Sequence, residues 1–114
     1  MKETISKVVF MANLAYYDKC RELKGTLDPK NVDLDANCYF ELDEVPDTFD
    51  FSKPNSRVAS PLFRKRELQK ALCFVKPPGM SDYETRQAES SALEAVCECL
   101  KAYGIISHVR WSYH

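Results

Sequence analysis

Residues 81–104 carry the strongest structural constraint in the chain, because signals for both ends of a helix are present. Ser81 followed by Glu84 forms a capping box at the start, and Gly104 is a typical C-terminal stop. Between them, apolar residues recur at spacings of three and four: Ala88, Ala92, Val96, Cys99, Leu100 and Tyr103, with Leu93 at the flank. The segment therefore predicts an amphipathic helix that buries one face against the rest of the chain.

Residues 4–24 predict another helix, with apolar residues on more than one face. Its main stripe comprises Ile5, Val9, Ala12, Tyr16, Cys20 and Leu23, and Gly25 follows as a C-cap signal. Phe10, Met11 and Leu14 fall off this stripe. Either the helix is buried on more than one side, or it presents apolar surface to a partner. Asn13 lies beside the stripe and is expected to be a satisfied amide of the core.

A shorter helix begins at the dipeptide Ser60-Pro61, since these residues are favoured at the N-cap and the first helical position. Its last turns are ambiguous, because residues 71–75 also suit a strand. Alternating polar and apolar residues predict strands at 38–42 and 105–114. We therefore expect residues 1–114 to form a single α+β domain of about three helices packed on a small sheet, with an all-α fold as the alternative.

Acidic and basic residues are segregated, although the formal net charge is only −1. Acidic side chains dominate residues 28–50, and basic ones dominate residues 53–76. Clustered charge steers and selects partners, so we predict an acidic docking surface for another protein, able to imitate phosphate charge. Its residues are Asp33, Asp35, Glu41, Asp43, Glu44 and Asp47. The alternative is that the two blocks face each other within the fold.

Nucleic-acid binding is a second hypothesis. The basic stretch 57–76 and the C-terminal aromatic residues are of the types that grip phosphates and stack on bases. The residues concerned are Arg64, Lys65, Arg66, Lys70, Arg110 and Trp111. The acidic block argues against this hypothesis, because it would repel the same nucleic-acid backbone unless it faces away.

No recognisable motif for catalysis or cofactor binding occurs in the sequence. The chain has only three glycines and no G-x-S-x-G, so neither a phosphate-binding loop nor a nucleophile elbow is present. Glu89 falls on the apolar stripe of residues 81–104, where a structural pairing is favoured over a general acid. We therefore expect no catalytic residue and no cofactor. A small enzyme without a recognisable motif is the third hypothesis.

Two arrangements imitate metal sites. Oxygen-bearing side chains within residues 33–44 follow the spacing of a calcium loop, but Cys38 stands where the loop needs glycine, and prolines interrupt both flanking helices. Cys97 and Cys99, followed by two histidines, suggest half of a zinc site. Residues two apart on a helix point about 200° away from each other, so the two thiols could not reach one ion. We expect no metal site.

The five cysteines are odd in number and lack close regular spacing, which favours a reducing cytosol with unbonded thiols. Cys20 and Cys99 are expected to be buried. The N-terminal apolar run is interrupted by Asn13 and is expected to stay in the mature protein. No stretch is long enough to span a membrane. We therefore expect a cytoplasmic inhibitor, adaptor or regulator that binds another protein and makes no membrane contact.

Overall fold

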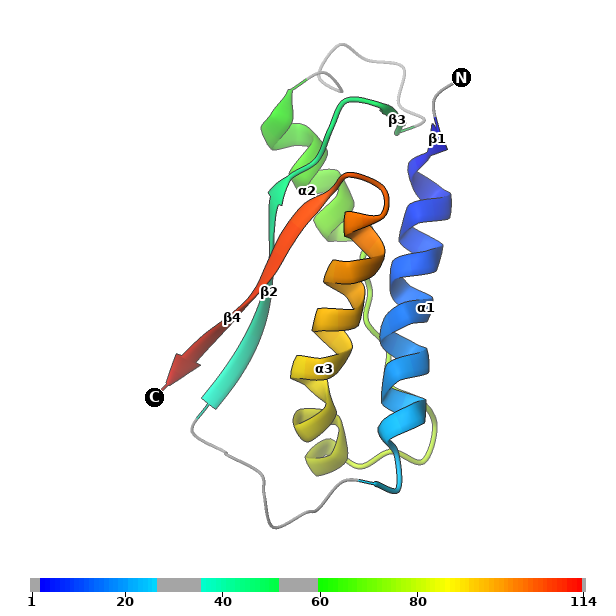
Figure 1. Cartoon of the computed structure of the whole chain (residues 1–114), viewed down its shortest axis with the longest axis vertical. Coiled ribbons are helices and arrows are strands. Elements are labelled where there is room, and N and C mark those ends of the chain that lie inside the picture. The colour runs from blue at the N-terminus through cyan, green and yellow to red at the C-terminus, as the bar shows by residue number, and fades with distance from the viewer. Residues whose placement is uncertain (1–2, 27–35, 52–59, 114) are drawn as a thin grey trace.

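The computed structural model of this chain describes residues 3–26, 36–51 and 60–113. Three helices in these ranges pack on a small antiparallel sheet, which confirms the α+β prediction over the all-α alternative (Figure 1). The elements in chain order are β1 (Glu3–Thr4), α1 (Ile5–Leu23), β2 (Ala36–Glu44), β3 (Phe49–Asp50), α2 (Pro61–Ala71), α3 (Asp82–Lys101) and β4 (Ile106–Tyr113). None of the helices in the described part of the chain combines the length and apolar character needed to cross a membrane.

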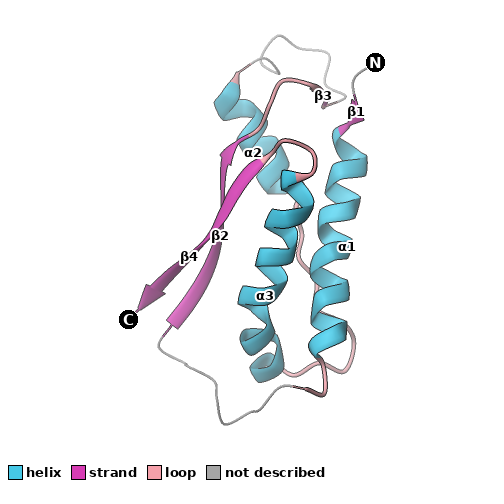
Figure 2. Cartoon of the chain, viewed as in Figure 1, coloured by secondary structure: helices cyan, strands magenta, loops and turns pink. Residues whose placement is uncertain are grey.

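The two long helices, α1 and α3, lie side by side along most of their length (Figure 2). Their facing sides bury mainly small and aliphatic residues: Val8, Ala12 and Cys20 of α1, and Ala88, Ala92, Val96 and Leu100 of α3. Small side chains at such a contact allow the helix axes to approach closely. This interface forms the centre of the hydrophobic core, as the two stripes predicted, except at one position of α1: Val8 is fully buried, whereas Val9, which the sequence placed on the stripe, is only partly buried.

The ends of α3 are also as predicted. The Ser81 hydroxyl accepts a hydrogen bond from the Glu84 N–H, and the Glu84 carboxylate accepts one from the Ser81 N–H, which completes the capping box. At the other end, Gly104 adopts φ +79°, and the Ile105 N–H donates to the Leu100 carbonyl at 3.0 Å. This glycine stop turns the chain back so that β4 runs alongside the helix it follows.

Strands β2 and β4 form an antiparallel ribbon, with register from Ala36 opposite Tyr113 to Glu44 opposite Ile106. The predicted strands are confirmed, and β2 is longer than the alternation indicated. The inner face of the ribbon packs against the core through Cys38, Phe40, Leu42 and Val109. The outer face carries polar and charged residues: Tyr39, Glu41, Asp43, His108 and Arg110. A register irregularity between Leu42 and Glu44 marks a bulge at Asp43.

The segment after α2 is neither a continuation of the helix nor a paired strand, the two forms that the sequence allowed. The helix ends at Ala71, and the chain continues in an extended conformation without a strand partner among the described residues. Phe74 stacks on Tyr16 at a ring-centroid distance of 4.9 Å and meets Phe40 edge-on at 5.7 Å, so it joins α1 to β2. Helical spacing from Leu68 and Leu72 predicted that Val75 would lie on the buried face of this helix, but Val75 is exposed.

A second short pairing was not predicted. Strands β1 and β3 run parallel, with Glu3 opposite Phe49 and Thr4 opposite Asp50. The sequence indicated only extended chain or loop at residues 48–56, of which 52–56 lie outside the described residues. Phe49 and Phe51 are buried, and Phe49 contacts Tyr103 edge-on. These contacts fasten the chain that follows β2 over the end of the helix pair.

Candidate functional site

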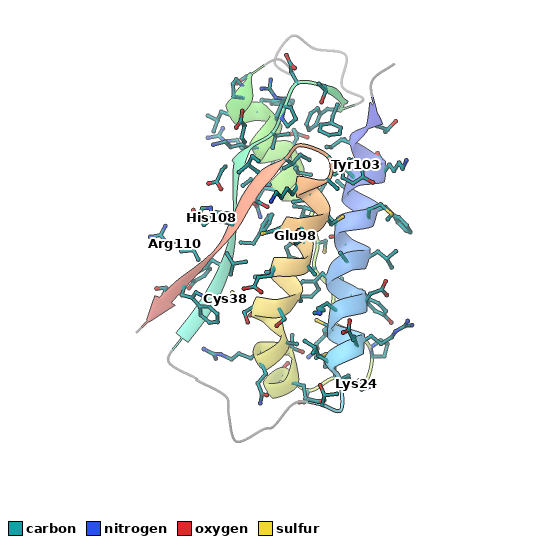
Figure 3. The ribbon with its side chains drawn as sticks, in the orientation of Figure 1. Lys24, Cys38, Glu98, Tyr103, His108 and Arg110 are labelled. Atoms are coloured by element: carbon teal, nitrogen blue, oxygen red, sulfur yellow. The ribbon has the colours of Figure 1, made fainter. Side chains whose placement is uncertain are left out.

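Charged side chains on the outer face of the ribbon form one connected cluster. The His108 ring lies between two carboxylates, with Nδ1 2.7 Å from Asp43 Oδ2 and Nε2 3.4 Å from Glu41 Oε2. Arg110 Nη1 donates to Glu41 Oε1 at 3.1 Å. Arg110 projects from the ribbon on the side away from α3 (Figure 3). The cluster joins the predicted acidic surface to a residue of the predicted nucleic-acid surface.

Because of these contacts, only part of the predicted acidic surface lacks a cationic partner. Glu41 and Asp43 contact cationic or potentially cationic partners, as described above. Glu44 and Asp47 are exposed, and no ion pair reaches either of them from the described residues. Asp33 and Asp35 lie outside the described residues. The segment from residue 36 to Glu44 is an extended strand, which is incompatible with a loop wrapped around one calcium ion.

The basic residues of α2 are also divided. Arg64, predicted on the surface, is buried, and its Nε donates to the Val45 carbonyl at 2.9 Å. The prediction was wrong because the partner carbonyl comes from the chain after β2, which helical spacing cannot reveal. Lys65 is half-buried, whereas Arg66 and Lys70 are exposed.

The acidic strand and the basic helix adjoin each other. A shallow groove of about 280 Å³ runs between β2 and α2 and is lined by Phe40, Glu41, Leu42, Lys65, Arg66 and Gln69. This arrangement is the one expected if the opposite charge blocks face each other. Trp111 lies on the other face of the ribbon from its neighbour Arg110, since successive residues of a strand alternate. The residues proposed for nucleic-acid binding therefore do not share one surface.

The largest gathering of exposed apolar side chains in the described residues lies on α1 and the extended segment beside it. Phe10, Met11, Leu14 and Val75 expose 64%, 38%, 38% and 59% of their surface. A groove of about 220 Å³ is lined by Phe10, Asn13, Leu14, Tyr17, Cys73 and Val75. We call the surface made by Phe10, Met11, Leu14, Tyr17, Cys73 and Val75 the α1 patch.

The α1 patch is held in shape by a specific contact. Asn13 Oδ1 accepts a hydrogen bond from the Cys73 N–H at 3.1 Å, so the amide oxygen is satisfied, but Asn13 is half-buried at the groove and does not lie in the core as predicted. Phe74 points inward against Tyr16, and the two residues on either side of it point outward. The extended segment is thereby fixed beside α1, with Cys73 and Val75 facing the solvent.

A wider groove separates α3 from β4. It has a volume of about 570 Å³ and is lined by Lys19, Ser91, Glu94, Ala95, Cys97, Glu98, His108 and Val109. Burial raises the pKa of the Cys97 thiol; a hydrogen bond with Ser107 opposes this effect, and the carboxylates of Glu94, Asp43 and Glu98 add to it. A nucleophilic thiol needs the opposite environment, one that favours the thiolate. No group of three or more metal-ligating side chains is found in the described residues.

Other ionisable groups lie at the edge of the core. Burial raises the pKa of Glu89, an effect that Arg86 opposes. Burial also raises the pKa of the Cys38 thiol to about 11. Cys20 is fully buried, as predicted, but Cys99 is only half-buried, because it stands at the edge of the α3 stripe and not at its centre. All five thiols are unbonded.

Three residues of the α1 patch escaped the sequence analysis: Tyr17, Cys73 and Val75. Tyr17 follows Phe10 by seven residues, so helical spacing could have placed it on the same row. Cys73 and Val75 point outward because side chains alternate on either side of Phe74. This alternation could not be predicted, because residues 71–75 suit a helix and a strand equally well.

No protein-family model matches the chain, and neither curated proteins nor solved structures show a significant match to it. Its function has therefore to be inferred from the arrangement of its own residues.

Proposed function

We propose that this chain is a non-enzymatic protein-binding module that docks its partner through the α1 patch. The single observation that carries the proposal is the gathering of large exposed apolar side chains on one continuous surface. Isolated exposed apolar residues are ordinary, but a contiguous group of them is typical of an interaction site. Adaptor, inhibitor and regulatory roles are all compatible with such a surface.

The composition of the α1 patch suits binding. Its aromatic members, Phe10 and Tyr17, are of the type that contributes most at protein interfaces. Burial of apolar surface contributes about 25 cal/mol per Å², whereas an exposed ion pair contributes about 0–1 kcal/mol. The acidic residues Glu44 and Asp47 can steer a partner toward the protein, but they supply less binding energy than the α1 patch.

The patch is also prepared for binding before a partner arrives. Most of it lies on α1, which packs along α3, and the rest lies on a segment anchored by Asn13 and Phe74. A surface that is already ordered loses less conformational entropy on association. The same rigidity distinguishes the α1 patch from apolar residues exposed on a flexible loop.

Site-specific photocrosslinking tests the proposal. A photoreactive phenylalanine replaces Leu14 in one variant and Leu62, an equally apolar and more exposed residue of α2, in a matched control. In extracts of the native cell we expect one crosslinked partner from position 14 and none from position 62. Phe10→Asp should abolish the crosslink, and Leu62→Asp should leave it intact. Equal crosslinking of the Phe10→Asp variant would contradict the proposal.

A further inference from the structure

We propose that the occupant of the α1 patch is one amphipathic helix whose apolar residues are flanked by acidic residues. This inference rests on the proposed function and names the chemical class of the partner. It comes from a row of residues along the exposed side of α1, which we call the α1 seam: Lys7, Phe10, Leu14, Tyr17 and Arg21.

The α1 seam has the spacing by which helices pair. Its members are separated by three, four, three and four residues, so they repeat every seven residues and form one continuous row. All five are exposed or half-exposed. Three apolar side chains occupy the middle, and a cation stands at each end, about 21 Å apart at 1.5 Å per residue. A partner helix that follows this row meets apolar surface first and positive charge on either side.

A second copy of the chain fits the α1 seam poorly. In a parallel pairing Lys7 would meet Lys7 and Arg21 would meet Arg21; in an antiparallel pairing Lys7 would meet Arg21. Either arrangement places like charges opposite each other, which is destabilising. The α1 patch is also much smaller than a standard stable interface, which has roughly 20–30 residues per side. Its size suits a single helix.

The ends of the seam provide selectivity. Asp18 is also exposed on α1 and flanks the seam, three residues from Arg21, but no ion pair joins these two described residues. A carboxylate at each end of the partner's apolar row would therefore meet Lys7 and Arg21 directly. Lys7 also interacts within its own chain, so Arg21 is expected to contribute the larger share of the preference.

Two synthetic helical peptides test this inference. Both carry three leucines at the spacing of the seam's apolar residues; one has Glu at the two flanking positions and the other has Lys. Fluorescence anisotropy at low salt should show that the wild-type protein binds the Glu peptide about tenfold more tightly than the Lys peptide. The double variant Lys7→Glu/Arg21→Glu should reverse this preference, and added salt should reduce both differences.

The possible results separate this inference from the proposed function. Equal affinity for both peptides, abolished by Phe10→Asp/Leu14→Asp, would overturn the acidic-helix inference and leave the α1 patch as a docking surface. No binding of the Glu peptide, or a dimer in sedimentation that Leu14→Asp disrupts, would also overturn the inference. A native partner that crosslinks equally well to the Phe10→Asp variant would instead overturn the proposed function.

Discussion

The outer face of the β2–β4 ribbon and the outer face of α1 are both exposed, but they differ in whether their side chains have partners within the chain. On the ribbon, Glu41 and Asp43 meet His108 and Arg110 across the two strands. On α1, Phe10 and Leu14 leave 64% and 38% of their surface exposed. The charged side chains of the ribbon are already paired within the fold, whereas the apolar side chains of α1 remain exposed.

The difference has a geometric origin. Residues opposite each other in an antiparallel pair have Cβ atoms about 4.5–5.5 Å apart, so charged side chains on one face readily find partners. A helix side that no other element covers has neighbours only from its own next turns. Segregated charge in a sequence is therefore weaker evidence for a binding surface than apolar residues that the fold leaves uncovered.

The largest effect is expected at Arg64. Arg64→Met removes a charged donor from the buried Val45 carbonyl and should lower the free energy of unfolding by about 2–3 kcal/mol. Arg66→Met, two residues further along α2 and exposed, is the matched control and should change it by less than about 0.5 kcal/mol. Urea unfolding measures both. Similar small values for the two variants would contradict a structural role for Arg64.

A smaller loss is expected at Asn13. Asn13→Ala removes the acceptor for the Cys73 N–H and should cost about 1 kcal/mol in urea unfolding. Amide hydrogen exchange at Cys73 should become faster, while exchange in the middle of α3 should change only by the global loss of stability. Unchanged protection of the Cys73 amide would show that the extended segment does not depend on this contact.

The ion pairs of the ribbon are expected to contribute less. A double-mutant cycle with Glu41→Gln and Arg110→Gln should give a coupling energy of about 0.2–1 kcal/mol at low salt, because both side chains are exposed. The coupling should disappear at about 1 M salt, where the Debye length falls to about 3 Å. A coupling that survives high salt would mean that the cluster is shielded from solvent.

Local signals account for most of the fold. The helix at residues 82–101 follows from Ser81, Glu84 and Gly104, and strands β2 and β4 follow from alternation, because both kinds of pattern act over a few residues. The contact between Glu41 and His108 could not be predicted in this way. It depends on the register between β2 and β4, which alternation restricts but does not fix.

The candidate site was predicted in part. Periodicity isolated Phe10, Met11 and Leu14 as residues off the buried stripe, but it could not decide between a second buried face and an open one. That decision depends on where the rest of the chain runs. The burial of Arg64 was missed for the same reason, since its acceptor belongs to a distant segment.

The smallest stability effect is expected at Glu89. Burial raises its folded-state pKa above the ordinary value of 4.5, so the folded state binds this proton more tightly than the unfolded state. Its contribution to stability therefore falls as pH rises from about 4.5 through the folded pKa. Glu89→Gln should stabilise the protein at pH 7 by a few tenths of a kcal/mol, and by about zero below pH 4, since the group is half exposed to solvent. Equal stabilisation at pH 7 and below pH 4 would show that the raised pKa of Glu89 is not the cause.

One comparison of affinities tests most directly whether the partner binds the α1 patch and not the acidic surface. The partner identified by crosslinking is titrated with the wild-type protein, with Phe10→Asp/Leu14→Asp, and with Asp43→Asn/Glu44→Gln/Asp47→Asn. We expect the α1 variant to bind at least about 100-fold more weakly, because large apolar and aromatic contacts dominate interfaces. The acidic-surface variant should lose no more than about threefold, mainly through slower association. The reverse order, with the α1 variant binding normally and the acidic-surface variant failing to bind, would contradict the account.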